Sequence, residues 1–462
     1  GADNTGLGYN ALYANTTGIN NTAVGALALT ANTTGAKNTA VGESALLLNT
    51  IGTDNTAVGA DSLDANTTGI QNTAVGRNAL GVNTIGTQNT AVGASALLSS
   101  TTATSNTGLG YAALAATTTG AANTAVGSEA LDANTTGASN VAMGTSALGA
   151  NTTASNNTAV GRSALGANTT GTRNTAMGAY SLDGTDANDN TAYGYATLSG
   201  ASGSENSAFG GSALVGNTGS DNSAFGYASL LGNTSGSNNS AFGHSSLFSS
   251  TTGNSNSAFG LNALYANTTG GANTAVGQSA LGANTTASNN TAVGYNSMVA
   301  NTTGALNAAV GYLSLDANTT GNYNTAFGAY SLTAATTASS NTGFGYGALS
   351  TNTTGSHNTA VGFQAMDAST TGTSNIAIGS NALDANTVGS DNVAIGRDSM
   401  TDNTTGTANT GVGLYTLRRN TTGVDNVAVG SYSLDANTTG AYNIALGSAS
   451  LGANTTGVRN TS

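Results

Sequence analysis

The chain repeats one pattern of apolar, small and polar positions about every 17 residues. The pattern is clearest from Asn72 to Leu80, which reads Asn-Thr-Ala-Val-Gly-Arg-Asn-Ala-Leu. With that Asn as position 1, the 27 complete units always have Gly at position 5 and only Ala or Gly at position 3. Position 4 is always a large apolar or aromatic residue, and position 9 is Leu or Met. A fixed period of this kind predicts a stack of similar units.

The alternation within one unit predicts a short β-strand at Thr73, Ala74 and Val75. We expect positions 2 and 4 to face the interior and position 3 to face outward. Gly76 is expected to form a corner with positive φ, followed by a second strand over positions 8 to 11. The Asn-Thr-Thr-Gly segment then returns the chain, with its Gly in the left-handed region. Abundant Gly, Thr and Asn without a 3.6-residue period argue against helices.

These elements predict an all-β fold, a β-solenoid of 27 coils of 16–17 residues in one continuous domain over residues 1–462. Stacking places each side chain over its equivalent in the next coil. Asn72 is expected to belong to an amide ladder, and Leu80 to an apolar ladder of buried side chains. Gly76 and Ala74 complete this predicted structural ladder.

The small residues at position 3 suggest contact with another chain. Ala74 and its equivalents would let a second backbone approach closely, which predicts a homotrimer packed through position 3. Local crowding at the corner would impose the same restriction and remains an alternative. Positions 6, 7 and 10 vary freely and are expected to face water.

Composition narrows the choice of partners. Charged residues make up 6 % of the chain, with 8 Lys and Arg against 20 Asp and Glu, a net charge of −12. This balance argues against binding nucleic acid or an anionic membrane surface. No apolar run is long enough to span a membrane, and the absence of Cys excludes disulfides and thiolate metal sites. The ends fall inside repeats, so we expect a segment of a longer protein whose anchoring or capping domains are absent from this chain.

Candidate chemistry is confined to the variable positions, and we expect neither an enzyme nor a cofactor. Position 6 carries tyrosines that could stack on sugars, although their irregular spacing favours scattered surface aromatics: Tyr9, Tyr111, Tyr195, Tyr227, Tyr295, Tyr312 and Tyr346. Aspartates recur at position 10 and invite a calcium hypothesis, but they come singly: Asp64, Asp132, Asp316, Asp384 and Asp435. His244 and His357 lie too far apart in the stack to cooperate. No catalytic triad or carboxylate pair is recognisable.

Many return loops contain an Asn-Thr-Thr tripeptide, which is an N-glycosylation acceptor pattern. Such tripeptides also arise freely in turns rich in Asn and Thr, and the Thr hydroxyls are alternative O-linked sites. The candidate sites are Asn15, Asn32, Asn66, Asn134, Asn151, Asn168, Asn267, Asn284, Asn301, Asn318, Asn352, Asn403, Asn420, Asn437 and Asn454.

Residues 174–221 form the one irregular block, with three 16-residue repeats that lose the usual loop. Phe209, Phe225, Phe242 and Phe259 then occupy position 4 in four successive units. We expect these larger rings to point inward and to change the cross-section there, as a bend or a receptor patch. Drift of duplicated repeats explains the block equally well.

Units such as those beginning Asn375-Ile-Ala-Ile-Gly, Asn392-Val-Ala-Ile-Gly and Asn426-Val-Ala-Val-Gly resemble the head repeats of YadA-like trimeric autotransporter adhesins. The repeats also look like the shafts of tail-fibre-like proteins with endosialidase-type chaperone ends. The adhesin resemblance covers the whole chain and implies a left-handed parallel β-roll, three chains side by side, at the bacterial cell surface. The family's usual unit is shorter than 17 residues, which predicts a longer outward loop here.

The predicted function is a non-enzymatic structural or adhesive segment of an extracellular fibre, either an adhesin head or a filament shaft. Its expected partners are copies of itself and host-surface, matrix or glycan ligands. A phage tail-fibre shaft is one alternative. An ice- or carbohydrate-binding solenoid is another, because regular Thr ranks on a flat face could order water. Against ice binding, the Thr pairs are expected to lie in loops and not on a strand face.

Overall fold

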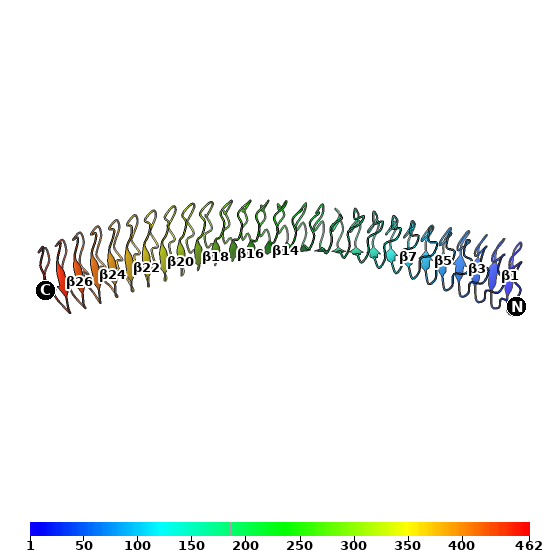
Figure 1. The fold of residues 1–462 in the computed structure, drawn as a ribbon, viewed down its shortest axis with the longest axis horizontal. Coiled ribbons are helices and arrows are strands. Elements are labelled where there is room, and N and C mark those ends of the chain that lie inside the picture. Colours follow the sequence, from blue (N-terminus) through cyan, green and yellow to red (C-terminus); the bar gives the residue numbers. More distant parts are fainter. Residues whose placement is uncertain (185) are drawn as a thin grey trace. The chain divides into compact units, whose positions relative to one another are not determined.

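The computed structural model describes residues 1–184 and 186–462, which form two compact units, Gly1–Ser223 and Ala224–Ser462. Each unit is a stack of coils in which the parallel strands lie along one side (Figure 1). The described residues contain 27 three-residue strands and no helix. The all-β solenoid predicted from the repeat is therefore confirmed.

One strand occurs per repeat, at positions 2 to 4. In the first unit the strands are β1 Thr5–Leu7, β2 Thr22–Val24, β3 Thr39–Val41, β4 Thr56–Val58, β5 Thr73–Val75, β6 Thr90–Val92, β7 Thr107–Leu109, β8 Thr124–Val126, β9 Val141–Met143, β10 Thr158–Val160, β11 Thr175–Met177, β12 Thr191–Tyr193 and β13 Ser207–Phe209. β14 Ser223–Phe225 spans the boundary between the units. In the second unit they are β15 Ser240–Phe242, β16 Ser257–Phe259, β17 Thr274–Val276, β18 Thr291–Val293, β19 Ala308–Val310, β20 Thr325–Phe327, β21 Thr342–Phe344, β22 Thr359–Val361, β23 Ile376–Ile378, β24 Val393–Ile395, β25 Thr410–Val412, β26 Val427–Val429 and β27 Ile444–Leu446.

Successive coils stack with the same positions in register. Strands β5 and β6 pair Ala74 with Ala91, and their flanking Thr and Val residues pair likewise. Axial hydrogen bonds also continue outside the strands, as from Leu80 N to the oxygen of Ala96 at 3.0 Å and from Val82 N to that of Leu98 at 3.1 Å. The backbone of a coil is therefore satisfied mainly by its two neighbours, which is what nearest-neighbour stacking requires.

The predicted second strand over positions 8 to 11 is wrong. Leu80 at position 9 has φ of 54°, and Asn78 at position 7 has φ of 58°. Position 17 also lies in this region, as at Gln71 with φ of 58°. A left-handed residue reverses the local direction of the backbone, so a segment with two such residues cannot run as an extended strand. The segment is a series of turns that still stacks on its neighbours.

The predicted orientation of the strand is also wrong. Ala74 is fully buried, whereas Thr73 and Val75 on either side are partly exposed. The interior is too thin for a large side chain at position 3: a Cβ placed on Gly108 would lie 3.2 Å from the oxygen of Ala113. Crowding inside the coil therefore explains why position 3 is always Ala or Gly. A trimer packed through position 3 is excluded, because that side chain lies in its own coil's core.

Three predicted features of the ladder are confirmed. Leu80 and Asn72 are fully buried, and Gly76 turns the corner with φ of 134°. The glycine of the return loop differs from expectation, because Gly69 does not have positive φ. Its lack of a side chain leaves room for the amide oxygen of Asn66, which lies 2.3 Å from where a Cβ would stand.

The shortened repeats of the 174–221 block keep the strand register, since Ala176 still pairs with Ala192. The predicted inward rings are wrong, because position 4 faces outward throughout. The rings stack along the axis instead, with centroids 4.9 Å apart for Phe242 and Phe259. Thr185, in one shortened loop, lies outside the described residues.

Replacing Ala74 with leucine should destabilise the stack by overpacking its interior. Forcing extra methylenes into a packed core costs about 1–3 kcal/mol, and the opposite wall here is backbone that cannot turn aside. Val75→Leu is the matched control, because Leu109 and Leu446 occupy the same outward position naturally. Urea unfolding should show a lower midpoint for Ala74→Leu only; equal loss in both variants would contradict the assignment of faces.

Candidate functional site

The first Asn of each repeat forms a buried ladder that joins consecutive coils. Asn72 Nδ2 donates to the oxygen of Gly86 at 2.8 Å and to Asn55 Oδ1 at 3.2 Å. Its Oδ1 accepts from the backbone N–H of Asn89 at 3.0 Å. The Asn72 side-chain amide thus provides the hydrogen bonds that buried polar groups of the coil would otherwise make to water. Position 1 is therefore structural and does not form a ligand site.

A second buried amide ladder runs at position 12, and sequence reasoning missed it. Asn66 Nδ2 donates to Asn49 Oδ1 at 2.8 Å and to the oxygen of Gly69 at 3.1 Å. The recurrence of Asn at this position is the signal for it, but the same Asn also fits a return turn and a modification pattern. Both ladders meet at one carbonyl, since Asn55 Nδ2 also donates to Gly69 at 2.9 Å.

The candidate glycosylation sites belong to this second ladder. Asn15 and Asn454, close to the ends of the chain, are half-buried, and the other candidates are fully buried. The fully buried set is Asn32, Asn66, Asn134, Asn151, Asn168, Asn267, Asn284, Asn301, Asn318, Asn352, Asn403, Asn420 and Asn437. A glycan is attached through Nδ2, and in Asn32 this atom already donates to Asn15 Oδ1 at 2.9 Å inside the coil. The folded coil therefore does not present these amides for modification.

The outward face of the sheet carries two rows of side chains, at positions 2 and 4. Position 2 is mostly Thr, and no residue at either position is charged. Every position-4 side chain is at least partly exposed; Leu109 and Phe344 are 45 % and 55 % exposed. We call these two rows the outer ladder. Each unit therefore presents an uncharged, partly apolar sheet face that the described residues leave at least partly open to solvent.

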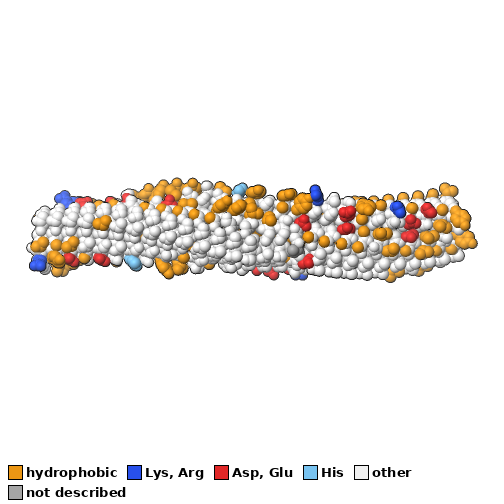
Figure 2. All heavy atoms as spheres, turned by 90° about the horizontal axis from the view of Figure 1, so that it is seen from above, with side chains coloured by type: hydrophobic (Ala, Val, Ile, Leu, Met, Phe, Trp, Pro, Cys, Tyr) orange, Lys and Arg blue, Asp and Glu red, His pale blue; other side chains and the backbone are white. Residues whose placement is uncertain are grey.

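The position-6 tyrosines are exposed, as expected, but they are not all scattered. Tyr9 and Tyr111 are exposed and contact no other ring among the described residues, whereas Tyr295 and Tyr312 stack with centroids 5.5 Å apart. Figure 2 shows hydrophobic side chains gathered in bands on a surface that is otherwise mostly uncharged and polar. Tyr330, at position 7, adds a ring that the position-6 pattern does not predict: it meets Tyr312 edge-on, with centroids 5.4 Å apart.

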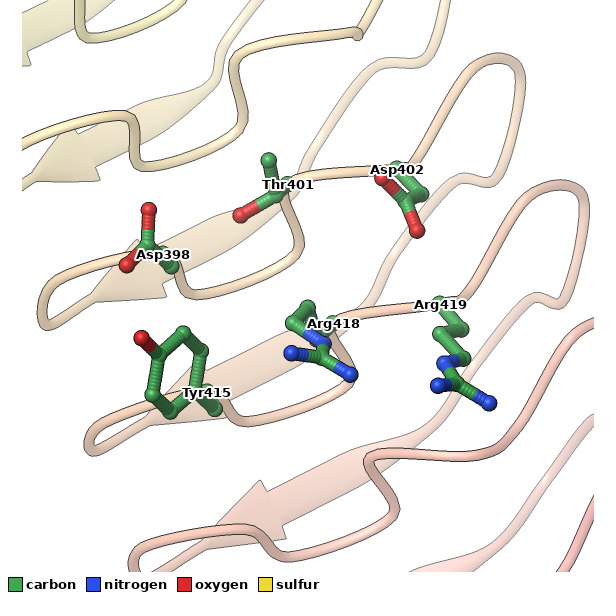
Figure 3. Close-up of a pocket in the computed structure, with 6 residues that line it drawn as sticks. All are labelled: Asp398, Thr401, Asp402, Tyr415, Arg418 and Arg419. Carbon is green, nitrogen blue, oxygen red and sulfur yellow. The ribbon is translucent and has the colours of Figure 1, made fainter.

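A hollow of about 410 Å³ lies between two neighbouring coils of the second unit. Asp398, Thr401 and Asp402 line it from one coil, and Tyr415, Arg418 and Arg419 from the next (Figure 3). The Arg418 guanidinium lies 5.2 Å from the centroid of the Tyr415 ring, a cation–π contact. Two carboxylates and two guanidinium groups balance in charge, so the hollow does not select an ion of either sign.

The recurrent aspartates do not form a metal site. Among residues 1–184 and 186–462 there is no group of three His, Cys, Asp or Glu side chains that could hold an ion. Burial raises the pKa of Asp64, Asp132, Asp316 and Asp384 above the ordinary value. His244 contacts the ring of Tyr227, with centroids 5.3 Å apart, and shares a 2.9 Å hydrogen bond with Ser245.

Replacing Asp316 with asparagine should stabilise the protein at neutral pH. One carboxylate oxygen of Asp316 is buried without a hydrogen-bond partner, and burial raises the pKa of the group. A raised folded-state pKa means that the folded chain binds the proton more tightly, so stability rises as pH falls from 7 towards the ordinary value near 3.8. Above the raised pKa the charged form opposes folding, and asparagine removes that cost.

The measurement is the urea midpoint of the wild type and Asp316→Asn at pH 7 and pH 4.5. The variant should be more stable at pH 7, and its advantage should shrink at pH 4.5. Asp54→Asn, which changes an exposed carboxylate in another coil, controls for net charge. If both variants gained the same stability, overall repulsion between negative charges, and not burial of Asp316, would explain the stabilisation.

Comparison with known proteins adds no family assignment: no family model matches the chain, and no curated protein matches it significantly. Within the described part of the chain, no helix is both long and apolar enough to cross a membrane. The functional argument therefore rests on the coil geometry and on the surfaces just described.

Proposed function

We propose that the chain is a non-enzymatic structural and adhesive segment of an extracellular fibre. One observation carries the proposal: each coil bonds to its neighbours around most of its backbone, while its sheet face carries the uncharged outer ladder. A stack of this kind can extend by adding repeats without changing its cross-section. The hollows are open surface features without a recognisable catalytic constellation among the described residues.

The outer ladder supports association with copies of the same chain, and the resemblance to trimeric adhesin heads makes three the proposed number. An apolar side chain contributes about 1.5–3 kcal/mol when fully buried, and a ladder repeats part of that gain coil after coil. The absence of charge at positions 2 and 4 removes the repulsion that would oppose packing of like faces. This proposed interface replaces the position-3 contact that the fold excludes.

The test is sedimentation equilibrium of the purified chain with a matched pair of double variants. Val58→Lys with Val92→Lys adds two charges to the outer ladder, and Ala60→Lys with Ala94→Lys adds two charges at position 6. We expect a trimer mass for the wild type and the position-6 pair, and a monomer mass for the position-4 pair. A monomeric wild type, or a trimer that survives charging of the outer ladder, would refute the proposed assembly.

The extracellular location is tested separately. The same segment could belong to an adhesin head, a filament or a phage tail-fibre shaft, and these differ in where the chain is found. Antibodies against the native chain should label the surface of intact cells if it belongs to an adhesin or filament. Labelling confined to virus particles would favour the tail-fibre shaft, and label inside intact cells only would refute the extracellular assignment.

Ice binding is the second candidate, and one observation favours it over the expectation from the sequence. Position-2 Thr residues such as Thr73 and Thr90 lie on the exposed strand face and not only in loops. They form rows beside the apolar position-4 residues, with one strand spacing between coils. Thermal hysteresis in a freezing assay would support this function, and its absence would exclude it.

A further inference from the structure

An unbroken run of aromatic rings crosses five successive coils of the second unit. The rings belong to Tyr295, Tyr312, Tyr330, Tyr346 and Phe363, and neighbouring centroids lie 5.5, 5.4, 5.7 and 5.6 Å apart. We call this run the aromatic strip. Figure 2, which keeps the horizontal axis of Figure 1, shows hydrophobic side chains gathered along an edge of the C-terminal half.

The fold does not require these rings. Position 6 is Ala, Ser, Gly or Arg in other coils, which stack with the same register. Tyr295, Tyr346 and Phe363 are 44 %, 51 % and 51 % exposed, so they contribute little to the interior. Exposed aromatic groups in contact with one another are typical of binding surfaces, because they offer flat apolar area at low conformational cost.

A hollow of about 370 Å³ opens within the aromatic strip. Tyr330 and Tyr346 form two of its walls, with ring planes inclined at 76°. Gly347 occupies position 7 between Tyr330 and Gln364 of the adjacent coils, so the row of position-7 side chains has a gap there. The hollow is therefore a product of one glycine in a row of larger residues.

Polar groups complete the lining of this hollow. Thr333, Ser350 and Asp367 stand at position 10 of three successive coils, and Gln364 at position 7. The Ser350 hydroxyl donates to the Asp367 carboxylate, which orients both groups. Flat rings together with hydroxyl, amide and carboxylate groups match a ligand with apolar faces and hydroxyl edges.

We propose that the aromatic strip and its hollow bind a neutral saccharide chain. One sugar stacks on Tyr330 or Tyr346 with its hydroxyls bonded to Asp367, Gln364 or Ser350, and further sugars extend along the strip. Asp367 is the one charged residue among the described residues lining the hollow, so nucleic acids and acidic polysaccharides are repelled. The inference rests on the proposed adhesive function and assigns it a class of ligand.

The experiment is native gel electrophoresis of the full chain in gels containing a neutral polysaccharide: dextran, yeast mannan or hydroxyethyl cellulose. Alginate, which is acidic, is the charged comparison. At least one neutral polymer should retard the wild type, and alginate should not. Tyr330→Ala and Tyr346→Ala should each weaken that retardation by about tenfold in apparent affinity, because each removes a stacking wall.

Two further variants separate binding from folding. Gly347→Tyr should fill the hollow and abolish retardation while the chain remains folded, because Tyr180, Tyr330, Tyr415 and Tyr432 occupy position 7 with φ of 58°, 57°, 53° and 58°. Tyr111→Ala removes an isolated exposed ring from the first unit and should leave retardation unchanged. Sedimentation of each variant reports whether assembly is preserved.

No retardation by any neutral polymer, retardation by alginate alone, or retardation insensitive to Tyr330, Tyr346 and Gly347 would overturn the saccharide site. A chain that assembles but is not retarded by any neutral polysaccharide would overturn the saccharide site and leave the fibre proposal standing. A monomeric chain that still binds the neutral polymer through these residues would overturn the assembly and leave the saccharide site standing.

Discussion

Gly76→Ala should unfold the stack around its coil, although it adds a single methyl group. Gly76 has φ of 134°, and a Cβ there would lie 2.6 Å from the oxygen and 2.7 Å from the carbon of Gly93 in the next coil. The unfavourable backbone conformation alone costs about 1–3 kcal/mol, and the clash is with backbone that holds the axial hydrogen bonds. Relief requires the two coils to move apart, so the effect should reach both neighbours.

The measurement is hydrogen exchange resolved along the sequence, combined with urea unfolding. Amide protection should fall around β4, β5 and β6 in Gly76→Ala. Gly81→Ala, five residues further along the same coil, is the control, because a Cβ there meets no atom closer than 3.3 Å and that glycine does not have positive φ. If the two variants lost the same amount of protection, the corner geometry at Gly76 would not be what excludes a side chain there.

Asn72→Ala should have the second large effect, because it breaks the amide ladder in the interior. The change removes the Oδ1 atom that accepts both from the backbone N–H of Asn89 at 3.0 Å and from Asn89 Nδ2 at 3.2 Å. A buried donor left without a partner costs about 1–3 kcal/mol, and the Asn89 N–H is left in that state. Asn89 Nδ2 loses one of its two bonds and keeps the other, to the oxygen of Ala103 at 2.8 Å. The cost can exceed that of a Val or Leu truncation on the outer face.

Thr68→Ala, in the return loop of the preceding coil, is the matched control because Thr68 is exposed. Denaturant unfolding followed by circular dichroism should show a clear loss for Asn72→Ala and little change for Thr68→Ala. Asn72→Ala with wild-type stability would show that water enters the coil and satisfies Asn89. The interior ladder would then be dispensable at that coil.

The two wrong predictions about strand orientation, position 4 inward and the phenylalanine rings inward, have one physical cause. Position 4 is always large and position 3 always small, which predicts position 4 inward when the core of an ordinary domain is assumed. This solenoid is so thin that only Ala or Gly fits between the strand and the opposite backbone, as the surroundings of Gly108 show. The large position-4 side chains therefore point outward, where they form the outer ladder and the stacked phenylalanine rings.

The two amide ladders were predictable to different degrees. Asn72 stands at position 1, which is Asn in every repeat, and the period alone predicts that these side chains stack. Asn66 lies in a tripeptide that is also a modification signal, and nothing local separates the two roles. Burial decides it: in the folded coil the Asn66 amide points inward and bonds to Asn49 and Gly69.

The sequence by itself determined the all-β repeat, its period, the parallel register and the corner at Gly76, because each follows from a residue that recurs at a fixed spacing. Only the tertiary structure decided which face of Thr73–Val75 is buried and where the chain adopts left-handed backbone. Leu80 and Gln71 take positive φ although neither residue type favours it. Their conformations are imposed by closing a coil of 17 residues whose backbone groups must bond to the coils above and below, a condition that no single repeat contains.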